Sequence, residues 1–175
     1  MKRVRWMAVL SLALPLWCQP RAPEAFGQIG YGMAEADDGS LGKGVVFGGA
    51  LTVPFAARWA VDIDVHHQRA ARNSKTGNTF GVRRTLAIPA ILYRRGSNRL
   101  YWFGGGGAGG RLDRMFDRMP NQPEFKTSQN GVAYGGRTGV VAAATDRLLA
   151  RVDFYWVHTH VAPDVGVKIG IGYRF

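Results

Sequence analysis

At 175 residues the chain has room for a single domain, and its 23 Lys and Arg against 12 Asp and Glu give a formal charge of +11. Its mean hydropathy of −0.11 excludes a bundle of membrane helices, although 46% of its residues are apolar. Its 24 glycines argue against a helical protein, because glycine costs roughly 1 kcal/mol in a helix interior.

Residues 1–25 have the pattern of a secretory signal peptide. A basic start, "MKRVR", precedes the apolar run "WMAVLSLALPLW", which is too short to span a bilayer as a helix. The small residues of "CQPRAPEA" suggest cleavage near Ala25, with Ala22 as the alternative site and an uncleaved anchor as the alternative fate. The only cysteine, Cys18, follows a tryptophan, which does not fit lipoprotein processing. We therefore expect an exported, cysteine-free mature domain at residues 26–175.

Eight segments with alternating apolar and polar residues follow, and we find no helical period of apolar residues among them. Each is close to the ~10 residues that a tilted strand needs to cross a bilayer. The segments cover residues 26–36, 44–55, 58–68, 81–93, 99–112, 131–144, 148–160 and 164–175.

The connections between these segments mostly alternate between short and long. The longest loops are expected at residues 69–80 and 113–130. Outer-membrane barrels show this asymmetry, with short periplasmic turns and longer external loops. An even number of strands would place both ends of the mature chain on the periplasmic side.

The two faces of each segment differ in polarity. In residues 58–68 the apolar face runs from Trp59 to Val65, and the polar face holds Asp62 and Asp64. Alternation alone does not say which face points inward, because a soluble barrel buries its apolar face and a membrane barrel buries its polar one.

Three features favour the membrane barrel. Glycine dominates the polar face of residues 164–175, which suits the crowded interior of an eight-stranded barrel. An open sheet with such apolar strands would aggregate at its edges, and closure removes those edges. Aromatic residues gather near segment ends, as in the girdles at the two membrane interfaces. They are Tyr31, Phe55, Trp59, Tyr93, Tyr101, Trp102, Phe103, Tyr173 and Phe175.

The sequence therefore predicts an all-β fold, an eight-stranded antiparallel up-and-down transmembrane β-barrel (meander). The final "GIGYRF" resembles the closing strand of bacterial outer-membrane β-barrel proteins. "GGALTVPFAARWAVDIDVH", "LYWFGGGGAGGRLD" and "DRLLARVDFYWVH" resemble the small eight-stranded outer-membrane barrel domain, related in shape to the OmpA and OmpX barrels. The resemblance covers residues 26–175 and implies a location in the cell outer membrane. It also implies that Tyr173 and Phe175 belong to the signal that the barrel assembly machinery reads.

Charged residues on the polar faces predict an interior network, since isolated charges within a bilayer-spanning barrel cost several kcal/mol. We expect these charges to pair and fill the lumen, because eight strands leave no open channel. A gated ion pathway is the alternative. The predicted network consists of Asp62, Asp64, Arg137, Arg151, Asp153, Lys168 and Arg174.

Histidines offer a possible metal site near the outer rim, where "DIDVHH" supplies His66 and His67 and "WVHTH" supplies His158 and His160. The two stretches belong to the third and seventh strands, which lie across the barrel from each other. We therefore expect ordinary rim histidines and no cofactor.

An enzyme is not expected. Lipid A deacylases of similar size carry a His-x-Ser-Asn motif on a late strand, and the matching stretch here begins at His158 and Thr159. Its nucleophile position holds His160 and its asparagine position holds Val161, so the attacking serine is missing. The glycines of residues 104–110 are not followed by the helix that a dinucleotide site needs.

Basic residues lie in and beside the two longest expected loops, where they act either as ordinary solvated charges or as binding groups for the phosphates of lipopolysaccharide. Nucleic-acid binding is not expected of an exported chain without a reading motif. We expect a monomer with a structural or surface-binding role through its extracellular loops. The alternatives are a deacylase-like, lipid-modifying enzyme and a soluble lipocalin-like carrier. The basic residues are Arg69, Arg72, Lys75, Arg83, Arg84, Arg111, Arg114, Arg118 and Lys126.

Overall fold

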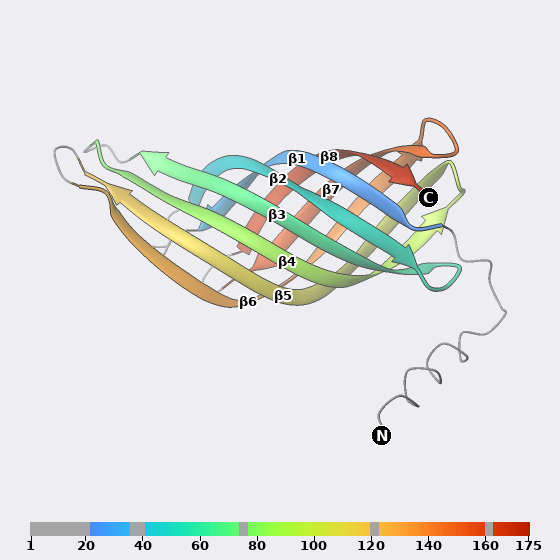
Figure 1. Ribbon diagram of the computed structural model, residues 1–175, viewed down its shortest axis with the longest axis horizontal. Helices are drawn as coiled ribbons and strands as arrows, with labels where there is room; N and C mark the ends of the chain where they lie inside the picture. Colours follow the sequence, from blue (N-terminus) through green and yellow to red (C-terminus); the bar gives the residue numbers. More distant parts are fainter. Residues whose placement is uncertain (1–21, 36–40, 74–76, 120–122, 160–162) are drawn as a thin grey trace, which may run out of the picture.

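The protein forms a closed antiparallel barrel in which each strand pairs with its neighbours in the chain and β8 pairs with β1 (Figure 1). The computed structural model describes residues 22–35, 41–73, 77–119, 123–159 and 163–175. This arrangement confirms the predicted eight-stranded up-and-down barrel. The strands are β1 (Glu24–Glu35), β2 (Leu41–Pro54), β3 (Trp59–Asn73), β4 (Thr79–Gly96), β5 (Leu100–Arg118), β6 (Phe125–Ala143), β7 (Leu148–His158) and β8 (Pro163–Arg174). In the described part of the chain, no helix is long and apolar enough to cross a membrane.

The two faces of the strands have the orientation of a membrane protein. On β3, Ile63 is 43% exposed while its neighbour Asp64 is 2% exposed. On β8, Ile169 is 58% exposed while Lys168 is 1% exposed. Apolar side chains therefore cover the outside of the barrel and charged ones lie inside it. The soluble-carrier alternative required the opposite orientation.

Strands β3 to β6 are longer than the sequence predicted. Loops were expected at residues 69–80 and 113–130, but most of these residues belong to strands. β3 continues to Asn73, and β5 continues to Arg118. Figure 1 shows these hairpins extending past the other strands at the end away from the C-terminus. Backbone pairing continues there, although both faces meet water and the alternation of apolar residues is lost.

Aromatic side chains form a girdle near the end of the barrel that carries the C-terminus. The Trp59 and Tyr93 rings lie 5.2 Å apart, and the Tyr93 and Trp102 rings lie 6.2 Å apart. Tyr101 and Phe103 do not belong to this girdle, because both are buried inside the barrel. The prediction grouped three consecutive aromatics, but successive residues of a strand face opposite sides, so only Trp102 can meet lipid.

The glycine-rich part of β5 lies where neighbouring strands approach closely. A Cβ atom on Gly107 would lie 1.9 Å from the carbonyl oxygen of Pro89 and 2.7 Å from the Cα of Ala90, both on β4. These neighbours are backbone atoms, so they cannot swing aside as a flexible side chain would. Close strand packing therefore explains the glycine at this position.

The substitution Gly107→Ala is expected to lower the free energy of unfolding by about 1–3 kcal/mol, the usual cost of extra atoms in packed structure. Gly110→Ala is the matched control, because a Cβ at Gly110 would meet nothing within 4 Å. Urea unfolding in detergent micelles, followed by tryptophan fluorescence, compares the two variants. Equal free energies of unfolding would show that the barrel wall adapts to the added methyl group and that the close approach of β4 and β5 does not limit the residue at this position.

Candidate functional site

The centre of the barrel contains a chain of ion pairs built on two carboxylates of β3. Alternation along β3 turns both Asp62 and Asp64 inward, where they face β6 and β8 across the lumen. Arg137 on β6 links them, because its Nη1 lies 3.0 Å from Asp62 Oδ2 and 2.7 Å from Asp64 Oδ2. One guanidinium thus bridges two buried carboxylates, which brings three predicted residues together.

Arg151 on β7 extends the chain of ion pairs toward the end of the barrel that carries the C-terminus. Its Nε donates to Asp153 Oδ1 at 2.7 Å, and its Nη1 lies 3.2 Å from Asp62 Oδ1. Its guanidinium also lies 4.4 Å from the centre of the Phe103 ring and 5.0 Å from that of Phe26. The carboxylates and aromatic faces together replace the hydration that this buried cation has lost.

Lys168 on β8 donates to Asp64 Oδ2 on the other side of the network. The same carboxylate contacts His66, whose Nδ1 lies 2.5 Å from Asp64 Oδ1. A cavity of about 20 Å³ adjoins these residues, which is room for one water molecule. His66 was expected at the outer rim, but it lies deep in the lumen with its ring 5.2 Å from that of Tyr155. The sequence prediction missed this because β3 continues well beyond its expected end.

Arg174, the seventh residue of the predicted network, lies apart from the other six. Its Nη2 lies 2.8 Å from Glu24 Oε1, in a separate cluster at the end of the barrel that carries the C-terminus. Arg94 and Tyr101 complete that cluster by donating to the same carboxylate. Sequence reasoning missed Glu24 because it placed this residue in the signal peptide.

A third buried cluster lies on the other side of the central network. Arg84 Nε donates to Asp113 Oδ1 at 2.8 Å, and Arg84 Nη1 lies 2.5 Å from Asp164 Oδ2. Arg111 Nη1 lies 2.9 Å from Asp113 Oδ2. Both arginines lie within expected strands, but the sequence prediction grouped them with the basic residues that flank the loops and left them out of the interior network. Alternation along β4 does not reveal the orientation of Arg84, because Leu86 and Leu92 share its face and are also buried inside the barrel.

The outside of the barrel carries a row of three arginines on neighbouring strands. Arg69 of β3 is paired in register with Arg83 of β4, which is paired in register with Arg114 of β5. All three side chains are exposed on the outer face. Among the residues that the structure describes, none of the three has a carboxylate partner. Arg83 does lie over the Phe116 ring, with its Cζ 5.6 Å from the ring centre.

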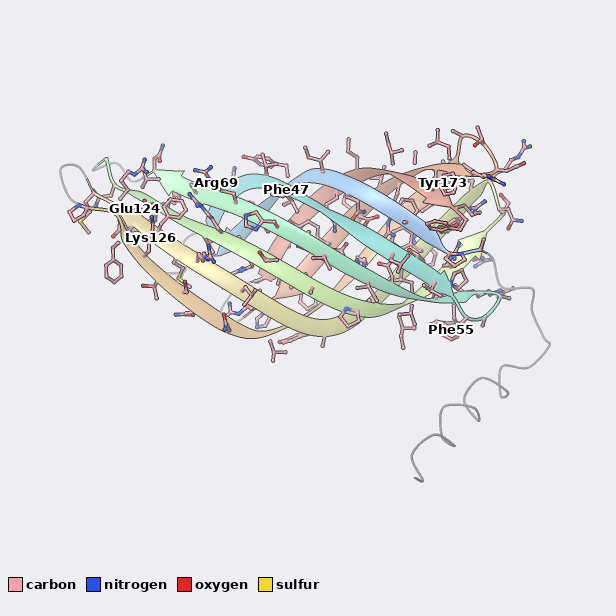
Figure 2. The ribbon with its side chains drawn as sticks, viewed as in Figure 1. Phe47, Phe55, Arg69, Glu124, Lys126 and Tyr173 are labelled. Carbon is pink, nitrogen blue, oxygen red and sulfur yellow. The ribbon has the colours of Figure 1, made fainter. Side chains whose placement is uncertain are left out.

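The arginine row lies where the outer edge of a membrane is expected. Figure 2 shows Arg69 at the opposite end of the barrel from Phe55 and Tyr173. From the Trp59 girdle to Arg69, β3 advances roughly ten residues, or ~33 Å at ~3.3 Å per residue. At the usual tilt of ~40°, this rise matches the ~25 Å height of the apolar band of outer-membrane barrels.

A groove on the outer surface lies beside two arginines of the row, Arg83 and Arg114. One part of it has a volume of about 460 Å³, and an adjacent part has about 290 Å³. Arg83, Arg114 and Ser128 line both parts, so the two cations and a hydroxyl group face the same groove. Lys126 adds a further cation, although Glu124 pairs with it at 3.3 Å. This is chemistry suited to phosphate or sulfate groups.

The two aromatic residues of the predicted assembly signal point outward near the C-terminus. The rings of Tyr173 and Phe175 lie 5.5 Å apart, and Arg147 Nη1 donates to the Tyr173 hydroxyl at 3.0 Å. Both side chains are exposed on the lipid-facing side of the barrel. They are therefore accessible from outside, as a recognition signal must be.

The stretch compared with lipid A deacylases lies at the end of β7. His158 ends this strand, with its ring 5.1 Å from that of Tyr134, and the Thr159 side chain is buried. His160 and Val161 lie outside the described residues. Within the described ranges, no three His, Cys, Asp or Glu side chains gather into a metal site.

No family model matches the chain, and no curated protein matches its sequence. Solved structures do match. Ail, the attachment invasion locus protein of Yersinia pestis, in complex with the heparin analogue sucrose octasulfate, has a TM-score of 0.60 at 14% identity, covering 90% of this chain and 100% of Ail.

Two further matches have the same kind of barrel. Neisserial surface protein A has a TM-score of 0.60 at 11% identity, covering 87% of this chain and 96% of its own. The N-terminal barrel of Pseudomonas aeruginosa OprF has a TM-score of 0.56 at 9% identity, covering 90% and 100%. With its apolar exterior and charged interior, the chain thus has the fold of the small eight-stranded outer-membrane β-barrels of bacteria.

Proposed function

We propose that this chain is a monomeric outer-membrane protein that binds phosphate-bearing lipopolysaccharide through cations on its outer face. The observation that carries the proposal is the row Arg69, Arg83 and Arg114, aligned across three strands at the outer edge of the apolar band. The extended hairpins above this row are the part of the molecule exposed to the cell's surroundings, and they would carry any further surface-binding role.

Electrostatics explains why the row needs an anionic partner. Like charges directly opposite each other on neighbouring strands destabilise a sheet. In the described part of the chain, no carboxylate forms an ion pair with these arginines, since Glu124, which lines the same groove, pairs with Lys126 and Arg118. A lipid phosphate at the same depth would do so, because guanidinium groups bind phosphate with two parallel hydrogen bonds.

The comparison with Ail supports anionic sugars as the ligand class. That barrel was solved in complex with a heparin analogue, sucrose octasulfate, which is a sulfated sugar. Phosphorylated sugars of lipopolysaccharide carry similar charged oxygens. The groove beside Arg83 and Arg114 offers cations and a hydroxyl group to such oxygens.

We also propose that the lumen is closed to ions. The chain of contacts from Asp153 through Arg151, Asp62, Arg137 and Asp64 spans the interior, and Lys168 completes it. An ion would have to break buried pairs to pass, which supports a filled lumen over a gated pathway. Little or no conductance in planar bilayers is expected, and steady single-channel currents would contradict this.

A lipid-modifying enzyme has less support. The deacylase-like stretch has no serine at the nucleophile position, and the buried Thr159 does not replace it simply. Mass spectrometry of lipid A from cells with and without the protein is expected to show the same acylation pattern.

The triple variant R69Q/R83Q/R114Q is expected to bind lipid A about 100-fold more weakly than the unmodified protein, since each cation near an anionic surface contributes about 1 kcal/mol. Native mass spectrometry of the protein in detergent, titrated with lipid A, measures the change. The triple variant R58Q/R95Q/R99Q is the control, because it removes equal charge from exposed positions at the other end of the barrel.

Dephosphorylated lipid A provides a second comparison. The unmodified protein is expected to lose most of its affinity for this lipid, and the arginine-row variant is expected to lose little more. Equal weakening by both triple variants would show that only net charge matters, and it would contradict the proposed site.

A further inference from the structure

Glu24 lies fully buried at the beginning of β1, where β1 meets the closing strand β8. Three side chains donate to its carboxylate. Arg174 Nε and Nη2 donate to Oε1 at 3.0 and 2.8 Å, Arg94 Nη2 donates at 3.3 Å, and the Tyr101 hydroxyl donates to Oε2. A side chain from β1 thereby joins β4, β5 and β8 inside one end of the barrel.

The backbone beside Glu24 also takes part in closing the barrel. The Phe175 N–H donates to the Pro23 carbonyl at 3.1 Å. Glu24 is paired in register with Arg174 on one side and with Thr52 on the other. Residues 23 and 24 therefore complete the seam between the first and last strands.

A mature chain that began at Phe26 would lack these contacts. Arg94 is only 3% exposed, and among the described residues its Nε and Nη1 have no hydrogen-bond partner and Glu24 is its one carboxylate partner, so losing Glu24 would leave a buried cation without an anion. The new terminal ammonium on Phe26 would add another positive charge to a barrel end that already carries Arg94 and Arg174. Both effects oppose closure of the barrel.

We propose that the mature protein retains Pro23 and Glu24, and that the Glu24 carboxylate is the latch that closes the barrel between β1 and β8. Removal of the signal peptide then takes place at or before the bond between Ala22 and Pro23. Water adds across that amide, leaving a carboxylate on the released peptide and an ammonium group on the mature chain. This proposal rests on the predicted signal peptide and is independent of lipopolysaccharide binding.

The intact mass of the protein extracted from outer membranes tests the position of cleavage. We expect a mass that includes Pro23 and Glu24. The mass of a chain that begins at Ala25 or Phe26 would overturn the proposal. Because the measurement uses the native protein, it does not depend on whether any variant folds.

The substitution Glu24→Gln tests the latch in the full mature chain. It keeps the size of the side chain but removes the charge that holds Arg94 and Arg174, so the unfolding temperature is expected to fall by roughly 6–20 °C. Glu124→Gln is the control, since Glu124 pairs only with more exposed cations at the other end of the barrel. Thermal unfolding in detergent, read from the heat-modifiable gel band, measures both.

A fall in E24Q no larger than that in E124Q would overturn the latch. A chain that starts at Pro23 and one that starts at Phe26, refolded side by side in detergent, give a second measure. The chain that starts at Pro23 is expected to give the compact band and the shorter chain to give less of it. Equal yields of the compact band would likewise overturn the proposal.

Discussion

The substitution Asp64→Asn is expected to lower the free energy of unfolding by about 3–5 kcal/mol, because it leaves buried cations without their anion. Asp64 contacts Arg137 at 2.7 Å, accepts a hydrogen bond from Lys168, and lies 2.5 Å from His66. Asparagine keeps the shape of the side chain, so the decrease in the free energy of unfolding results from the lost charge and not from a cavity. Urea unfolding in detergent micelles measures the change.

Asp146→Asn is the control for this experiment. Asp146 is an exposed carboxylate in the turn between β6 and β7, and this substitution is expected to change stability by less than about 0.5 kcal/mol. If D64N proved as stable as D146N, the central ion pairs would not hold the barrel together. Strand pairing and the buried apolar residues of the interior would then account for its stability.

The substitution Phe175→Glu is expected to block insertion into the outer membrane while costing only about 0–1 kcal/mol of stability, the usual range for a charge near the membrane interface. Phe175 is 70% exposed, and its ring lies 5.5 Å from that of Tyr173 on the outer surface, so the folded barrel loses little packing. The proposed loss is in recognition by the barrel assembly machinery. Fractionation of cells measures insertion, and refolding in detergent measures stability.

Phe55→Glu is the matched control, because Phe55 is an exposed aromatic residue beyond the end of β2 at the same end of the barrel. It is expected to insert almost normally. Similar losses of insertion in F55E and F175E would point to a general effect of charge at the interface. Loss of refolding equal to the loss of insertion in F175E would also count against a recognition signal.

The orientation of the barrel could be read from the sequence because one physical constraint acts on most strands, although Leu86 and Leu92 of β4 are large apolar residues that lie inside. Lipid requires apolar side chains on one face, and the narrow lumen requires paired charges or small residues on the other. That constraint put Asp62, Arg151 and Lys168 on the polar side of their strands, and the structure places all three inside. This constraint on the polarity of the two faces does not act beyond the bilayer. The predicted strand ends were wrong there for that reason.

The buried charged residues that the sequence did not predict lie where the polarity of the strand faces gives no clear signal. Asp113 was assigned to a loop because β5 continues past its expected end. Arg84 lies within an expected strand, but its face of β4 is also apolar, with Leu86 and Leu92 buried inside, so polarity did not mark that face as inward. Glu24 was not predicted as an interior residue because the small residues around it are typical of a signal-peptide cleavage region.

The arginine row could not be derived from the sequence for a different reason. Arg69, Arg83 and Arg114 are far apart in the chain, and only the register of three strands brings them side by side. A shift of one residue in any pairing would turn a whole strand over. Strand ends uncertain by a few residues therefore cannot specify such a row.

The most direct test of the account is the environment of a single spin label at residue 169, introduced as Ile169→Cys in the mature chain and reconstituted in a bilayer. Ile169 lies on β8 beside Lys168, and the structure turns it outward. We predict that the label is readily reached by oxygen dissolved in the lipid and poorly reached by a water-soluble nickel complex. A label shielded from lipid oxygen but open to the nickel complex would contradict the orientation on which every other inference depends.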